Sequence, residues 1–185
     1  MRNKQRILMI GILIGIFAFG QANGQELTLQ SDELQGQLTM HQVYAGLGCA
    51  GKNSSPALRW VGAPKNSRSF AITVYDPDAP TGSGWWHWLM VNIPADTRGL
   101  AADAGNLSKK LAPEGSLQSL TDFGTPGFGG ACPPVGDRPH RYIFTVYALD
   151  VAKLEITEQS PPALVGFMLN QHALAKASLL AYYGR

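Results

Sequence analysis

The most constraining feature of the sequence is an alternating apolar stretch that two prolines bring to an abrupt end. In Ser69–Tyr75, the side chains of Phe70, Ile72 and Val74 fall on one face of an extended chain. The segment Asp76-Pro77-Asp78-Ala79-Pro80 follows at once, and proline cannot continue a hydrogen-bonded ladder. The pattern therefore predicts a buried β-strand that ends in a stiff turn, with two carboxylates directly after the strand.

Other segments show short extended patterns of the same kind. We predict further strands or extended segments at Leu27–Leu29, Leu38–Met40, Leu58–Val61, Trp85–Ile93 and Arg141–Leu149. Ala95–Cys132 has little periodicity, and we expect long loops there. With 21 glycines and 12 prolines to supply turns, the chain is predicted to be mainly β, with antiparallel strands.

The C-terminal segment has a different period. Ser160 is a suitable N-cap and Pro161 a suitable first helical residue. Apolar-face residues then recur at three- and four-residue spacing, at Leu164, Phe167, Met168, His172, Ala175 and Leu179. We therefore predict one long C-terminal helix that begins after Ser160 and ends near Gly184.

Residues 1–24 have the composition of a secretory signal peptide. A basic start is followed by the apolar run Ile7–Phe19 and then by small residues, with cleavage expected after Ala22 or Gly24. The alternative is an uncleaved anchor, although a membrane-spanning helix needs about 20 apolar residues. We expect residues 25–185 to form a single domain that is periplasmic or secreted and, once cleaved, is not an integral membrane protein.

The charge of the mature part is close to neutral. Three of the 15 basic residues lie in the predicted signal peptide, which leaves 12 against 13 acidic residues. This balance does not indicate a nucleic-acid partner.

The chain has two cysteines, Cys49 and Cys132. In an exported protein an even number of cysteines is typical of a disulfide, and we expect these two to be bonded. The alternative is a pair of unbonded, buried thiols. A catalytic thiol pair is not indicated, because no CxxC spacing is present.

Five polar residues lie near the ends of the predicted strands: Asp76, Asp78, His87, His140 and Tyr142. Sites where strand ends meet loops commonly bind ligands. Each residue also has a structural interpretation when it is taken alone. An aspartate before proline caps a turn, a histidine among tryptophans packs in a core, and a strand tyrosine is usually buried. The spacing of these residues leaves both interpretations open.

Longer motifs indicate a family. The stretch Phe70–Pro80 followed by Trp85-Trp86-His87-Trp88 resembles the signature of the phosphatidylethanolamine-binding protein family. Three further segments resemble that family: Ser55–Trp60, Gly130-Ala131-Cys132-Pro133-Pro134 and Pro139-His140-Arg141-Tyr142. The resemblance extends from about Gly51 to Arg185, and the ending His172–Arg185 resembles the C-terminal helix of bacterial members.

The resemblance implies an antiparallel β-sandwich with peripheral helices and a small cavity for phosphate-like anions. Carried over residue by residue, it assigns ligand binding to Asp76, Asp78, His87, Gly130, Pro133, Pro134, His140 and Tyr142. It implies no cofactor, no metal and no catalysis. The expected ligand is phosphate or a phospholipid head group, held by N–H bonds from the two histidines, the Tyr142 hydroxyl and a nest of backbone N–H groups near Gly129.

Two other functions remain as alternatives. The first is a protein-interaction role, such as inhibition of a protease or a kinase through the outer surface. The second is a metal-dependent hydrolase, because two aspartates and two histidines can hold a metal ion. No HExxH, HxH or Gly-x-Ser-x-Gly motif supports that second alternative.

Overall fold

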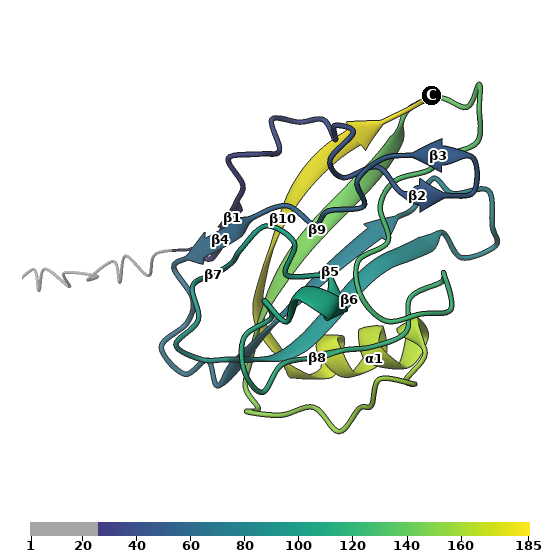
Figure 1. Cartoon of the computed structure of the whole chain (residues 1–185). Coiled ribbons are helices and arrows are strands. Elements are labelled where there is room, and N and C mark those ends of the chain that lie inside the picture. Colours follow the sequence, from purple (N-terminus) through teal and green to yellow (C-terminus); the bar gives the residue numbers. More distant parts are fainter. Residues whose placement is uncertain (1–25) are drawn as a thin grey trace, which may run out of the picture.

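The alternating stretch after Ser69 forms the middle of the structure. The computed structural model describes residues 26–185, so the predicted signal peptide lies outside the described residues. Strand β5 (Ser69–Asp76) is the central strand of a five-stranded antiparallel sheet (Figure 1). The order is β10-β9-β5-β6-β8, with β6 at Trp85–Pro94, β8 at Leu117–Gln118, β9 at His140–Leu149 and β10 at Ala173–Tyr183.

A second sheet covers one face of the first. It contains β1 (Thr28–Gln30), β4 (Leu58–Val61) and β7 (Gly99–Leu100), and a separate hairpin joins β2 (Ala45–Gly46) to β3 (Cys49–Ala50). The two sheets meet in a shared apolar core, where the ring centroids of Trp60 and Phe70 lie 5.4 Å apart. The predicted β-sandwich is thereby confirmed.

The opposite face of the large sheet carries the helix α1 (Pro162–His172). Val165 and Leu169 of α1 are fully buried against Ala71 and Leu89 of the sheet. A short 3-10 turn, η1 (Leu107–Lys109), lies in the long segment between β7 and β8. The large sheet is thus covered on both faces, which explains why both sets of alternating β5 side chains are buried.

The predicted C-terminal helix is wrong in its second half. The helix ends at His172, and the next eleven residues form β10, which pairs with β9 along its whole length. The backbone N–H of Asp150 donates to the His172 carbonyl (3.0 Å) at the junction between the helix and the strand. The apolar residues of Ala173–Tyr183 fit the period of a helix and also that of a strand. The segment forms a strand because it can pair with the open edge of β9.

Two smaller predictions also fail. Ser160 does not cap the helix, because its hydroxyl accepts a hydrogen bond from the Thr157 N–H (2.9 Å) and Pro161 occupies the N-cap position. The predicted extended segment Leu38–Met40 forms no named strand. Its neighbour Gln37 only bridges the end of β10.

The expected disulfide between Cys49 and Cys132 is present, with 83 residues of separation. It joins the β2–β3 hairpin to the segment that leads into β9. The Arg185 guanidinium donates to the carbonyls of Pro133 (2.6 Å) and Gly48 (3.0 Å), so the C-terminus holds the same two segments together. In Figure 1 these parts lie at one end of the molecule.

Asp78 fixes the turn after β5 to the start of β9. Its carboxylate accepts the backbone N–H and Nε–H of Arg141 (2.9 and 2.8 Å), while Arg138 donates to the other oxygen (3.1 Å). The hydrogen bonds from Arg141 hold the pKa of the Asp78 carboxyl well below its usual range, despite its burial. Asp78 is therefore a structural anchor of the turn.

Replacement of both cysteines by alanine should lower the free energy of unfolding by about 2–4 kcal/mol, because the long loop is then free in the unfolded chain. Urea unfolding with and without reductant measures this. Reductant should move the wild-type midpoint to that of the variant and leave the variant unchanged. Equal midpoints for oxidised wild type and variant would contradict the prediction.

Asp78→Asn should destabilise the fold by about 1–2 kcal/mol at pH 7, a modest value because water screens the exposed arginines. A depressed folded-state pKa adds stability above the unfolded-state pKa of about 3.9 and loses it as the pH falls. The gap between wild type and variant should therefore shrink from pH 4 to lower pH in urea titrations. Asp96→Asn, at an exposed position, is the matched control. A gap that is independent of pH would refute this role.

Candidate functional site

A cavity of about 220 Å³ lies where β5, β6 and β9 meet the loops at one end of the large sheet. Six of the eight residues proposed from the sequence line it: Asp76, His87, Pro133, Pro134, His140 and Tyr142. Leu47, Phe123 and Trp85 complete much of the remaining wall. The structure therefore brings together residues that lie up to 95 positions apart in the sequence, from Leu47 to Tyr142.

The site continues the core face of two neighbouring strands. On β5, the face that buries Ile72 and Val74 ends with Asp76. On β9, the face that buries Phe144 begins with His140 and Tyr142. Because β5 and β9 are antiparallel, the end of one lies beside the start of the other. The polar ends of two apolar faces thus meet at one place.

A β-bulge places His87 in the same wall. Val74 pairs with Trp88 and Tyr75 pairs with Trp86, so His87 is the extra residue in β6. A bulge of this kind re-aims a side chain at the sheet surface. His87 lines the cavity while the neighbouring Trp88 remains in the core beneath it.

Asp76 acts as an acceptor for its surroundings. One carboxylate oxygen accepts the N–H groups of Asp78 (2.8 Å) and Ala79 (3.1 Å) in the turn. The other oxygen accepts Nδ1–H of His140 (2.8 Å), and both side chains are only 3% exposed. Asp76 therefore orients the turn and the imidazole. The Nε2 atom of His140 lies 3.4 Å from the Asp137 carboxylate.

His87 is held in one tautomer. Its Nδ1 lies 2.8 Å from the carbonyl oxygen of Gly129, which can only accept, so Nδ1 carries the proton. Burial lowers the pKa of His87, and the Gly129 carbonyl and the Asp76 charge oppose that effect without cancelling it. The neutral ring then offers Nε2 as a hydrogen-bond acceptor. The role expected from the sequence was that of a donor only.

Two donors in the cavity wall have no partner. Among the described residues, four buried side-chain polar atoms lack a hydrogen bond, and the Tyr142 hydroxyl and Trp85 Nε1 are two of them. The Tyr142 hydroxyl lies near the Asp76 carboxylate but does not meet hydrogen-bond geometry with it. Burial, and then this charge, raise the pKa of Tyr142 above its usual range, so the phenol keeps its proton. An unsatisfied buried donor costs about 1–3 kcal/mol. The cavity thus favours a ligand that accepts hydrogen bonds.

Two predicted site residues do not line the cavity. Asp78 turns its carboxylate toward Arg138 and Arg141, because the guanidinium groups neutralise it there. Gly130 packs behind the wall, and a Cβ at this position would lie 2.2 Å from the Gln42 carbonyl oxygen.

The predicted nest of backbone N–H groups is also absent from the cavity. The Gly129 N–H donates to the His87 carbonyl (2.8 Å), and the Gly130 N–H donates to the Asn53 side chain (2.7 Å). These donors are already used to hold the wall, so they are not free for an anion.

The site predicted from the sequence did not include Phe123, Leu47 or Trp85. Phe123 lies in the segment without periodicity, where no local signal distinguishes a pocket residue from a loop residue. Trp85 carried a weak signal, because it shares a face with His87 in an extended strand.

Residues 26–185 contain no cluster of three or more His, Cys, Asp or Glu side chains that could hold a metal ion. Within the same residues, no helix is both long enough and apolar enough to cross a membrane.

Comparison with known proteins adds relatives for nearly the whole chain. YbcL of Escherichia coli is 46% identical over 179 residues, which cover 96% of this chain and 98% of YbcL. YbhB of Escherichia coli is 49% identical over 147 residues, or 80% of this chain and 92% of YbhB. The crystal structure of Escherichia coli YbcL superposes with a TM-score of 0.85 at 50% identity and covers 86% of this chain and 99% of that one.

The family model for phosphatidylethanolamine-binding proteins matches residues 30–184. That range contains the large sheet, α1, every residue of the cavity wall named above, and the second sheet apart from Thr28 and Leu29 of β1. The fold, the relatives that match over most of the chain and the family model agree. The chain belongs to the phosphatidylethanolamine-binding protein family.

Proposed function

We propose that this protein binds a small oxyanion, either phosphate or a compact phosphomonoester such as a phospholipid head group in its free form, without transforming it. The observation that carries the proposal is the pair of unpartnered donors in the cavity, the Tyr142 hydroxyl and Trp85 Nε1. Phosphate oxygens are strong acceptors and would satisfy both donors. The family name agrees with a phosphate-bearing head group.

The protonation state of the ligand follows from the wall. The carboxylate of Asp76 repels a dianion, but the monoanion of a phosphomonoester still carries one O–H. That O–H can donate to Nε2 of neutral His87, while the other oxygens accept from Tyr142 and Trp85. Alternatively, His87 takes up the proton and donates to a dianion. In both routes the complex holds one proton more than the free phosphate dianion and the free protein with neutral His87 hold together.

Tyr142→Phe should reduce the affinity for phosphate about tenfold, because it removes one donor to the anion. The same change should leave the stability of the free protein unchanged or raise it, since an unsatisfied buried hydroxyl is removed. Calorimetric titration with phosphate and with O-phosphorylethanolamine measures affinity, and urea unfolding measures stability.

Tyr147→Phe is the matched control, because that tyrosine lies on the opposite face of β9. It should leave the affinity unchanged. A Tyr142→Phe variant that loses stability but keeps its affinity would show that the hydroxyl serves the fold and would count against the proposed site.

The affinity for O-phosphorylethanolamine should fall as the pH rises from about 5.5 to 8, because the second pKa of a phosphate monoester is about 6 and the complex retains a proton. Titrations in buffers of different ionisation enthalpy should show proton uptake on binding above pH 6. His87→Ala should abolish saturable binding, as it removes the proton acceptor. Affinity that is flat or rises with pH would contradict this mechanism.

We also propose that the protein is exported to the periplasm or secreted. The disulfide supports this proposal, because such bonds persist in oxidising compartments. The basic start and the apolar run of residues 1–24 also support it, because they are typical of a signal peptide. Mass spectrometry of protein from fractionated native cells should find an N-terminus at Asn23 or Gln25 outside the cytoplasm. A cytoplasmic chain that starts at Met1 would overturn this proposal.

A further inference from the structure

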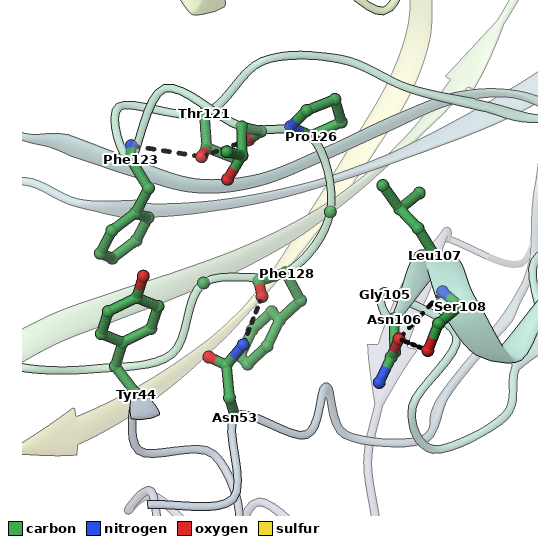
Figure 2. A pocket seen from close by; sticks show the side chains of 13 residues that line it. Tyr44, Asn53, Gly105, Asn106, Leu107, Ser108, Thr121, Phe123, Pro126 and Phe128 are labelled. Carbon is green, nitrogen blue, oxygen red and sulfur yellow. Dashed lines mark hydrogen bonds between the residues drawn. The ribbon is translucent and has the colours of Figure 1, made fainter. Parts of the chain in front are cut away.

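A second cavity, of about 240 Å³, shares one wall with the proposed anion cavity. Figure 2 shows it between the rings of Tyr44 and Phe123 on one side and the Asn106–Ser108 segment at η1 on the other. Its lining contains no Asp, Glu, Lys, Arg or His side chain. It is therefore an uncharged site beside a site that suits an anion.

The shared wall is the side chain of Phe123, which lines both cavities. On the side of the second cavity, its ring stacks on Tyr44 with a centroid separation of 4.5 Å. On the anion side, the same ring makes edge contacts with Trp85 and His87, each at 5.4 Å. One aromatic ring therefore separates the two cavities.

The position of this ring is built into the loop. The N–H of Phe123 donates to the Thr121 hydroxyl (3.2 Å), which itself donates to the Thr125 carbonyl (2.8 Å). At Gly129, a Cβ would lie 2.3 Å from the Phe123 ring, so only glycine lets the ring pack there. These contacts fix the position of the Phe123 ring between the two cavities.

The second cavity offers uncharged hydrogen-bonding groups. The Asn106 side-chain oxygen accepts from the N–H and the hydroxyl of Ser108 (3.0 and 2.8 Å), which orients the amide and leaves its NH₂ as a donor. The Tyr44 hydroxyl projects beside Phe123 (Figure 2). Amide and hydroxyl groups next to aromatic rings suit a hydroxyl-rich, uncharged group such as a sugar.

We propose that Phe123 is the residue that sets the size of the ligand accepted by the anion cavity. With the ring in place, phosphate and compact phosphomonoesters fit, and the body of a sugar phosphate is excluded from the space behind it. Without the ring, the two cavities become continuous, and the uncharged one receives the hydroxyl-rich part of a larger phosphomonoester. This inference rests on the proposed binding of an oxyanion and adds its selectivity.

The test is calorimetric titration of phosphate, O-phosphorylethanolamine and glucose 6-phosphate into wild type and Phe123→Ala. Wild type should bind glucose 6-phosphate at least about tenfold more weakly than phosphate. In Phe123→Ala, the affinity for glucose 6-phosphate relative to that for phosphate should rise about tenfold.

Three further variants make the result specific. Asn106→Leu combined with Phe123→Ala should reverse the gain for glucose 6-phosphate, and Asn106→Leu alone should not alter phosphate binding. Phe167→Ala, at a 58% exposed ring on α1, is the matched control and should behave as wild type. If Phe123→Ala does not fold, Phe123→Leu takes its place in the test. Leucine keeps apolar volume in the loop, so this variant should show a smaller gain in the affinity for glucose 6-phosphate.

The outcomes separate this inference from the function on which it rests. Absence of phosphate binding in folded wild type would remove the proposed function itself. Phosphate binding with equal wild-type affinity for glucose 6-phosphate would overturn the role of Phe123 alone. So would an unchanged ratio of the two affinities in folded Phe123→Ala or Phe123→Leu.

Discussion

The buried carboxylate of Asp76 connects the strand, the turn and the cavity. One oxygen accepts two backbone N–H groups of the turn that follows β5, and the other accepts the His140 imidazole at the start of β9. A buried charge without such partners would be costly, so these bonds and the local fold depend on one another. The anchor at Asp78 repeats this arrangement two residues further along the turn, where arginines take the place of the imidazole.

The remainder of the site contrasts with this satisfied network. The polar groups of Asp76, Asn53 and Thr121 are used within the fold, whereas Tyr142 and Trp85 keep buried donors without a partner. Proteins seldom retain such donors, because each one lowers the stability of the free protein. The donors belong to residues that line a cavity bordered by the disulfide-bonded Cys132 and by the Phe123 ring, which is the arrangement of a preformed binding site.

Prediction from the sequence worked where local pattern and tertiary context agree. The strands at Leu58–Val61 and after Ser69 combine β-forming residues with prolines or turns at their ends, and both are confirmed. It failed at Ala173–Tyr183, where alanines and leucines suit a helix and only the unpaired edge of β9 decides for a strand. Phe123 was missed for a related reason, since its role depends on packing against residues distant in the sequence.

The sequence by itself determined the mainly β class, the central strands, the cysteine pair and most of the polar cavity wall. These follow from side-chain alternation, from the geometry of proline and from motifs that the family shares. Only the tertiary structure decided the strand at the C-terminus, the removal of Asp78 and Gly130 from the cavity and the tautomer of His87. Each of these depends on a partner that is distant in the sequence: the open edge of β9, the arginines beside Asp78, or the Gly129 carbonyl. The local sequence around a residue does not determine where such a partner lies.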